Sequence, residues 1–419
     1  MEPVPVVGWG FFPLDEELAL TSGGSLTPMQ EEHLVRLAVW MPFARAAEQL
    51  GEVTGVQVSE ATVRRHTEKA GQAYVEVQTQ QSQEPEPSSD QGKQTEAKLV
   101  LSSDGAYVSL LHKQWAEVRT LAIGKVKQTD KQVRTYHLSY FSRMMDAATF
   151  ITVAEVETRR RHVLEATEVC AVTDGALWLQ DLVDLHRPDA VRILDFSHAA
   201  QRVGDIVDAL TQAGLPLPHD ALKRSLHLLK HRGPRFLLNA LTRLQASALA
   251  VEAIKEPLEY LRKREALMDY PRYQREGWPI GSGMVESANK TVMQARLKGA
   301  GMHWEPTHVN PMLALRTAVC SDRWSEAWDQ QNTHRLQQRK QRAGDRAVSR
   351  QEAAAARLVR AWWFWLSSCQ KSPLPSSPPP SPVRLSSTPA ATLPGSCRPS
   401  ASHPWKRSPA CRPQLSAKN

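Results

Sequence analysis

Apolar and polar residues alternate differently along the chain and divide it into helical, extended and polar stretches. Between Thr27 and Gln78 apolar residues recur every three to four positions, as in PMQEEHLVRLAVWMPFARAAEQLGEV, which predicts helices. Gly55 permits a turn, and Ser59 is a suitable N-cap for a helix that carries basic side chains. Residues 27–78 therefore resemble a helix-turn-helix DNA-binding domain, the alternative being an ordinary helical hairpin with a solvated basic face.

Extended runs dominate the middle of the chain. Residues 79–96 contain no large apolar side chain and predict a linker. Three extended runs follow, KLVLSSDGAYVSLL, QWAEVRTLAIGKV and RTYHLSYFS, and then a helical stretch over residues 146–164. Two strand–helix pairs come next, EVCAVTDG with ALWLQDLVDLH and AVRILDFS with HAAQRVGDIVDAL. This order predicts an α/β fold whose mixed sheet joins an antiparallel meander to parallel crossovers, with helices on both faces.

The second half of the chain is helical and then polar. Residues 217–270 are helical in pattern and interrupt the α/β alternation, which predicts an inserted helical subdomain. GWPIGSGMVESANKTVMQARLKGAGMHW then supplies a glycine-rich entry to a helix that begins near Gly283. Residues 331–366 predict a basic helical segment, and residues 367–419 are too rich in Pro and Ser to fold. Residues 1–26 precede the helical domain as an extension.

Composition adds only modest constraints. Lys and Arg outnumber Asp and Glu by 52 to 44, and the resulting charge of +8 weakly favours a polyanionic partner such as nucleic acid. The five cysteines have no zinc-ligand spacing and predict no disulfide framework. No signal peptide and no apolar run of the roughly 18 residues that a membrane span needs is present, so we expect a cytoplasmic protein without membrane contact.

Three acidic residues have the positions expected of metal ligands. Asp104 follows the apolar run LVLSS, Asp174 follows VCAVT, and both precede a glycine that lets the backbone approach a ligand. Ligands bind at the carboxyl ends of strands in open sheets, and Glu286, on the helix entered through GSGMV, supplies a third carboxylate. Such a set suits two Mg²⁺ or Mn²⁺ ions that activate a water or a 3′-hydroxyl in phosphoryl displacement. Strand-end Asp-Gly pairs are also common as plain turns.

Longer segments between Phe11 and Trp324 carry a family resemblance. They are FFPLDEELAL, SSDGAYV, VTDGALW, ILDFSH, GWPIGSGMVESANKTVMQARLKGAGMHW and HVNPMLALRTAVCSDRW. Together they resemble the ISKra family of insertion-sequence transposases, relatives of the Mutator-like class. The resemblance implies an RNase H-like catalytic domain over residues 97–330, in which Asp104, Asp174 and Glu286 form the metal-binding DDE triad.

The resemblance leaves one alternative for the triad. Asp195, at the end of VRILD, competes with Asp174 as the second aspartate. We prefer Asp174 because Asp195 and His198 look like the Cys/Asp-x-x-His element that follows the second aspartate in Mutator-like enzymes. Asp195 and His198 are then accessory residues that tether the strand to the next helix or position DNA, or they form only a satisfied structural hydrogen bond.

Several other side chains are candidates for DNA contact. In the helix-turn-helix-like domain they are Arg64, Arg65 and Lys69, and after the triad glutamate they are Asn289, Lys290, Arg296 and Lys298, which recur at helical spacing. Trp304 either stacks on an extruded base or caps the core, and a buried tryptophan is the commoner case.

The function implied is DDE transposition, in which the enzyme cleaves the ends of an insertion sequence and joins the freed 3′-hydroxyls to target DNA. The partners implied are double-stranded DNA, namely terminal inverted repeats and target DNA, and further copies of the chain in a homo-oligomer, in the nucleoid-associated cytoplasm of a bacterium. A second hypothesis is a catalytically inactive DNA-binding remnant that acts as a helix-turn-helix regulator. A third is a structure-selective nuclease without strand transfer.

Overall fold

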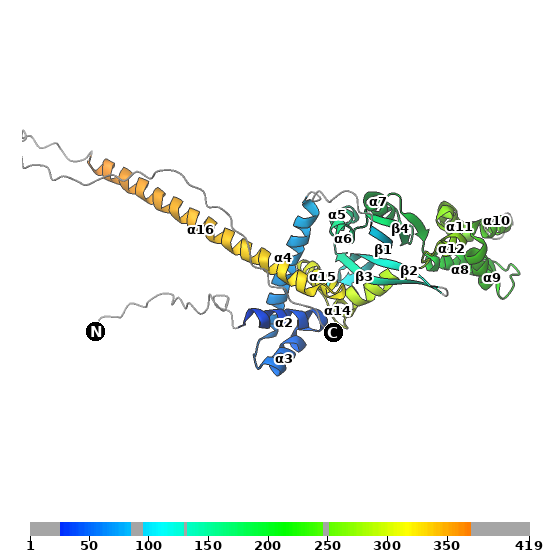
Figure 1. Ribbon diagram of the computed structural model, residues 1–419, viewed down its shortest axis with the longest axis horizontal. Coiled ribbons are helices and arrows are strands. Elements are labelled where there is room, and N and C mark those ends of the chain that lie inside the picture. The colour runs from blue at the N-terminus through cyan, green and yellow to red at the C-terminus, as the bar shows by residue number, and fades with distance from the viewer. Residues whose placement is uncertain (1–25, 85–94, 130–131, 246–250, 370–419) are drawn as a thin grey trace, which may run out of the picture. The chain divides into compact units, whose positions relative to one another are not determined.

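The computed structural model describes residues 26–84, 95–129, 132–245 and 251–369 (Figure 1). The predicted extension, except Leu26, most of the predicted linker and nearly all of the Pro/Ser-rich tail lie outside the described residues. Contacts divide the chain into two units, Met1–Ala347 and Val348–Asn419. No helix in the described ranges is both long and apolar enough to span a membrane.

Three helices open the described chain: α2 (Pro28–Trp40), α3 (Phe43–Thr54) and α4 (Glu60–Gln83). Thr27 and Gln30 form a reciprocal capping box at the start of α2. Gly55 ends α3 at φ +73°, and the Ser59 side chain caps α4 by accepting from the Thr62 amide, as the sequence predicted.

Five strands form one mixed sheet in the order β3-β2-β1-β4-β5. β1 pairs antiparallel with β2, and β2 with β3, whereas β1, β4 and β5 are parallel. The predicted meander followed by parallel crossovers is therefore confirmed. The strands are β1 (Thr95–Ser109), β2 (Trp115–Gln128), β3 (Val133–Arg143), β4 (Ala166–Thr173) and β5 (Val191–Leu194).

Helices cover both faces of the sheet because successive strand residues point to opposite sides. On one face Leu99 and Leu101 pack with α5 (Ala147–Val153) and α7 (Leu177–His186), next to the short α6 (Glu155–Arg160). On the other face Val100 packs with α8 (Phe196–Gln212) and the helices after it. Ala122 on that face packs with α13 (Gly283–Ala288) and the following π-helical η3 (Asn289–Gln294).

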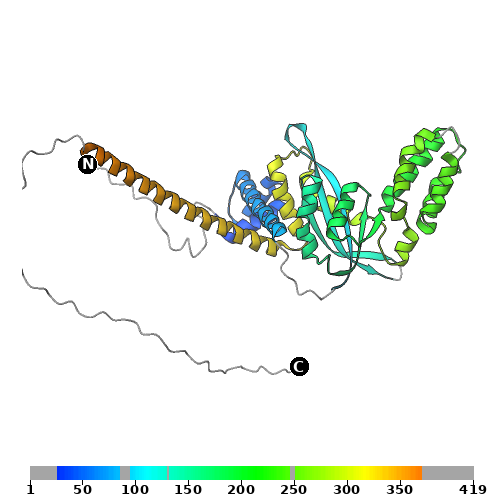
Figure 2. The same cartoon turned by 90° about the horizontal axis from the view of Figure 1, so that it is seen from above.

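The predicted helical insertion consists of α9, α10, α11 and η2, and in Figure 2 its green helices stand beside one end of the sheet. Their apolar faces pack on α8 in a shared cluster with Val172 and Ile193 of the sheet. The bounds are α9 (Ala221–Arg232), α10 (Pro234–Gln245), α11 (Val251–Lys263), η2 (Glu265–Leu267) and α12 (Tyr270–Arg275). The remaining elements are η1 (Leu111–Lys113), α14 (Ala295–Leu297), α15 (Pro306–Cys320) and α16 (Trp324–Cys369).

One position of the fold differs from the sequence prediction. Asp104, expected at the end of a strand, lies inside β1, which continues to Ser109. The pairing of β1 with β4 stops at Leu101, whereas its pairing with β2 includes Asp104 and runs on. The antiparallel partner β2 is longer than the parallel partner β4. Asp104 therefore lies beyond the part of β1 that pairs with β4, but within the part that pairs with β2.

Helix α4 connects the N-terminal helices to the sheet through α15. A Cβ on Gly71 of α4 would lie 2.3 Å from the Pro311 carbonyl oxygen, so the two helix backbones approach as closely as a glycine allows. Farther along, Tyr74 and Val77 pack against Ala314 of α15. The backbone contact at Gly71 therefore sets how α4 lies on α15.

We predict that Gly71→Ala lowers the melting temperature, because the new methyl forces the helices apart at a cost of about 1–3 kcal/mol. The matched control is Gly204→Ala in α8, where a Cβ meets nothing within 4 Å. Both changes improve helix propensity equally, so the control should melt at the same temperature or slightly higher. Equal melting temperatures for the two variants, measured by calorimetry, would contradict this account.

Candidate active site

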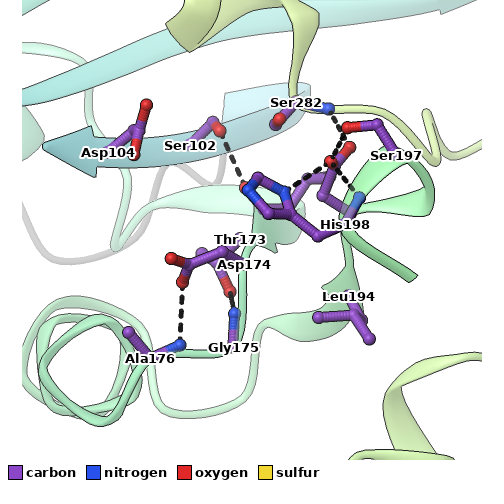
Figure 3. A network of polar contacts seen from close by, with 12 residues as sticks. Ser102, Asp104, Thr173, Asp174, Gly175, Ala176, Leu194, Ser197, His198 and Ser282 are labelled. Atoms are coloured by element: carbon purple, nitrogen blue, oxygen red, sulfur yellow. Dashed lines mark hydrogen bonds and ion pairs between the residues drawn. The ribbon is translucent and has the colours of Figure 1, made fainter. Parts of the chain in front are cut away.

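Asp104 and Asp174 occupy the same row of the sheet. The parallel pairing of β1 with β4 matches Leu101 with Ala171, and each aspartate lies three residues beyond its member of that pair. Equal offsets on adjacent parallel strands place two side chains next to each other and on the same face. Figure 3 shows the Asp104 side chain on its strand and the Asp174 carboxyl group at the loop that leads to Ala176.

Asp195 extends the row by one strand. The pairing of β4 with β5 matches Thr173 with Leu194, so Asp174 and Asp195 each come one residue later. The row therefore consists of Asp104, inside β1, and of Asp174 and Asp195, which each come directly after a strand. Their environments, however, are different.

The carboxylate of Asp104 is half-buried and held at both oxygens. The Gly105 amide donates to Oδ1 at 2.8 Å, and Asn289 Nδ2 donates to Oδ2 at 3.0 Å. Burial raises the pKa of Asp104, and the negative charges of Asp174 and Glu286 raise it further. Asp174 and Glu286 are therefore both near enough to act on the Asp104 carboxylate.

Asp174 lies in a turn that the helical insertion holds from outside. Its Oδ1 accepts from the Ala176 amide at 2.8 Å, as Figure 3 shows. Tyr260 of α11 donates to the Asp174 carbonyl, and Arg264 donates to the Gly175 carbonyl at 2.8 and 3.1 Å. Gly175 has φ +78°, a conformation that favours glycine. The sequence singled out neither Tyr260 nor Arg264, since nothing local marks a residue 86 or more positions away as a partner of this turn.

Glu286 and Asn289 lie one turn apart where the helix changes type. Glu286, in the short α13, is exposed, whereas Asn289 begins the π-helical η3 and is 4% exposed. Single π turns inside α-helices are frequent at functional sites. The Oδ1 atom of Asn289 is buried without a hydrogen-bond partner in the described part of the chain. Asn289, expected to face DNA, therefore contacts the candidate triad itself.

Asp195 is saturated by protein donors. Its Oδ1 accepts from the Ser282 amide at 2.7 Å, and Oδ2 accepts from His198 Nδ1 at 2.8 Å, from the His198 amide and from the Ser197 hydroxyl. Burial raises the pKa of Asp195, but these hydrogen bonds outweigh it and bring the pKa to about 2. Asp195 is the cap that fixes α8 to β5 and to the entry of α13.

The imidazole of His198 lies beside the row. Its hydrogen bond to Asp195 raises its pKa, and the negative charges of Asp195, Asp174 and Asp104 add to the effect against burial, which lowers it. Figure 3 shows the imidazole close to the two aspartates of β1 and β4. The ring is held on one side by Asp195 and presents its other side to the row.

The donor set is suited to a hard divalent cation. Carboxylate oxygens are the ligands that such ions prefer, and their mutual repulsion at Asp104 is what a cation would relieve. Within residues 26–84, 95–129, 132–245 and 251–369, no three His, Cys, Asp or Glu side chains are gathered closely enough to hold a metal ion. The carboxylates are electrostatic neighbours and are not at metal-ligand distances.

The basic residues predicted to contact DNA divide into exposed and buried sets. Those exposed are Arg64, Arg65 and Lys69 on α4, and Lys290 and Lys298 on the segment that follows Glu286. Arg296 is buried, 3% exposed, and its Nε donates to the Ala38 carbonyl at 2.9 Å. It also lies against the rings of Phe43 and Trp304. The expectation that Arg296 faces DNA is not consistent with this position, because its side chain joins α14 to α2.

Trp304 is also a packed residue. Its ring is 7% exposed within a cluster around Leu297 and Val309, and its Nε1 donates to the Leu297 carbonyl at 3.1 Å. This buried environment agrees with a Trp304 that caps the core and not with one that stacks on an extruded base.

We predict that the Asp195–His198 pair contributes stability in a defined pH window. The contribution of Asp195 is complete above its ordinary pKa of 3.8 and is lost as the pH falls toward about 2. The contribution of His198 is complete below its ordinary pKa of 6.5 and is lost as the pH rises through its raised pKa. Denaturant unfolding of His198→Gln should therefore show a loss of about 1 kcal/mol that is largest between these limits, discounted because the imidazole is 40% exposed.

The control is His219→Gln, which changes an exposed histidine outside the site. A stability difference between wild type and His198→Gln that stays constant from pH 2 to pH 9 would rule out the ion pair as its origin.

Comparison with known proteins gives one finding. No curated protein matches the chain. A family model matches residues 9–331, a range that contains every candidate site residue named above. The chain belongs to the uncharacterised protein family UPF0236.

Proposed function

We propose that this protein is a metal-dependent DDE transposase, of the kind implied by its resemblance to the ISKra family. The observation that carries the proposal is the row formed by Asp104 and Asp174 on adjacent parallel strands, with Glu286 close enough to act on the pKa of Asp104. These three residues are far apart in the sequence, and the charges of Asp174 and Glu286 both act on Asp104. Clustered unpaired carboxylates of this kind are costly unless they serve a cation or a proton transfer.

The topology supports an RNase H-like interpretation of the sheet. A three-stranded meander is followed by two parallel strands, with crossover helices between them. The helices of residues 221–267 lie between Asp174 and Glu286 in the sequence. They hold the turn at Asp174 through Tyr260 and Arg264. This arrangement suits a catalytic core with an inserted subdomain.

In the proposed reaction Asp104, Asp174 and Glu286 would hold two Mg²⁺ or Mn²⁺ ions. Such ions, when bound, would activate a water or a 3′-hydroxyl and stabilise the leaving oxygen of an in-line displacement. Asn289 orients the Asp104 carboxylate. Asp195 stays outside the ligand set because protein donors occupy its oxygens, and it holds the His198 ring beside the row, where the ring can meet a DNA phosphate.

The three N-terminal helices supply the proposed DNA-binding domain. The turn at Gly55 and the Ser59 cap orient α4, on which Arg64, Arg65 and Lys69 are exposed, as in a recognition helix. The proposed partners are terminal inverted repeats and target DNA. A homo-oligomer is proposed because two DNA ends are handled together, and the proposed location is the bacterial cytoplasm at the nucleoid.

We predict that Asp104→Asn, Asp174→Asn and Glu286→Gln each lower Mg²⁺-dependent cleavage of inverted-repeat DNA by at least about a thousandfold. Binding of the same DNA in EDTA should change by no more than about twofold. The control is Asp181→Asn, which removes an exposed carboxylate of α7 outside the site and should cleave like wild type. Retained cleavage in one of the three variants would remove that residue from the triad.

The same assay separates the rival functions. Pre-cleaved ends with a free 3′-hydroxyl should become joined to target DNA, whereas a structure-selective nuclease would leave them unjoined. A regulator derived from an inactive transposase would bind the repeats and neither nick nor join them at any Mg²⁺ or Mn²⁺ concentration.

We predict that Asn289→Ala raises the Mg²⁺ concentration needed for half-maximal cleavage about tenfold, because residues that orient a metal ligand typically affect metal affinity 10–100-fold. The control is Ser287→Ala, an exposed neighbour in α13. An unchanged Mg²⁺ dependence in Asn289→Ala would show that the hydrogen bond to Asp104 is only structural.

A further inference from the structure

A stripe of arginines runs along the first part of α16. Arg335, Arg339, Arg342 and Arg346 follow one another at spacings of four, three and four residues, which places them on the same face of a helix. Arg335 is buried and bonds to Glu31 of α2 at 2.8 Å, whereas the other three are exposed. Asp345 is the one acidic residue between positions 335 and 346, and it lies off this stripe.

Contacts with α2 and α4 fix which way the stripe faces. His334 Nε2 lies 2.9 Å from Oε2 of Glu76 on α4, and Gln338 Nε2 donates to the same oxygen at 2.6 Å. Arg335 bonds to Glu31, which His66 of α4 also contacts at 2.9 Å. These contacts anchor α16 to α2 and α4 over residues 334–338, immediately before Arg339.

Lys69 of α4 belongs to the same surface. Burial lowers the pKa of Lys69, and the positive charges of Arg335, Arg339 and Arg342 lower it further, against the opposing effect of Glu31. Glu31 is already engaged by Arg335 and His66. The adjoining Glu68 faces Arg64 and His308, at 3.9 and 3.1 Å. The positive side chains around Lys69 therefore outnumber the carboxylates that face them, Glu31 and Glu68.

Arg65 extends the surface along α4. It precedes Lys69 by four residues, so the two share a helix face, and it is exposed. In the described part of the chain no carboxylate forms an ion pair with Arg65, Lys69, Arg339 or Arg342. We define these four residues together with Arg346 as the α4–α16 basic surface.

We propose that the α4–α16 basic surface binds the phosphate backbone of duplex DNA, so that α16 contributes to DNA binding together with α4. The choice of DNA as the polyanion rests on the proposed function. From Arg339 to Arg346 the exposed part of the stripe spans about 10 Å at 1.5 Å per residue, enough to reach more than one phosphate of a duplex. Arginine suits this partner because its guanidinium pairs with phosphate through two parallel hydrogen bonds.

The surface is a poor fit for a membrane. A helix that lies in a lipid interface needs an apolar face opposite its charges. The stretch RKQRAGDR, residues 339–346, has no large apolar side chain on any face. Duplex DNA is therefore favoured over an anionic lipid surface as the partner.

The test is the binding of the full chain to a fluorescein-labelled 30-base-pair duplex, measured by anisotropy in EDTA at several salt concentrations. Arg339→Gln/Arg342→Gln should weaken binding about tenfold and reduce the slope of log K against log salt by about 1.8, as expected for two lost phosphate contacts. The matched control is Arg235→Gln/Arg243→Gln, which removes two exposed arginines from α10 and the same net charge. Both double variants should melt like wild type because the side chains are exposed.

Two outcomes would overturn the proposal. An equal loss of affinity in both double variants would mean that only net charge matters, and unchanged DNA binding in Arg339→Gln/Arg342→Gln, with or without lost binding to phosphatidylserine vesicles, would exclude this surface. Because EDTA prevents metal-dependent cleavage, the assay is independent of the triad. The two proposals can therefore fail separately. If the wild-type chain does not cleave DNA but Arg339→Gln/Arg342→Gln still weakens DNA binding, the transposase function is wrong and the DNA-binding role of the surface is retained.

Discussion

Parallel pairing of β1, β4 and β5 is the constraint on which the candidate site depends. The register places Asp104, Asp174 and Asp195 in one row, and adjacent carboxylates in a row repel one another when they are half-buried. Hydrogen-bond donors from α8 and the entry of α13 saturate Asp195 and stabilise its negative charge at one end of the row. Asp104 is the member of the row whose pKa is raised by neighbouring carboxylates, so an external cation would relieve repulsion there.

Elements from distant parts of the chain support this row. The insertion holds the backbone at Asp174 and Gly175 through Tyr260 and Arg264, while η3 brings Asn289 to Asp104. A change in the position of the insertion would therefore move Asp174, and a change in η3 would move the Asp104 carboxylate. The α4–α16 basic surface also depends on distant segments, because it exists only when α4 and α16 pack together.

Local sequence was sufficient for the elements and their order. The period of apolar residues predicted the helices before the sheet, the five strands and the helical segment at 217–270, because burial of one face imposes that period directly. Gly55 and Ser59 were predictable for the same reason: a helix end is decided by its own few residues. Asp104 and Asp174 were recognisable as site candidates because each follows an apolar run and precedes a glycine.

Tertiary structure decided what those residues touch. Asn289 and Arg296 have the same polar character in the sequence as the exposed Lys290, yet one binds Asp104 and the other joins α14 to α2. Their partners lie 185 and 258 positions away, and no local pattern encodes contacts over such distances. The sequence by itself determined which segments are helices or strands, because apolar periodicity is a local property. Only the folded chain decided that Asp104 lies inside a strand and that protein donors saturate Asp195, because both depend on the sheet register and the helix packing.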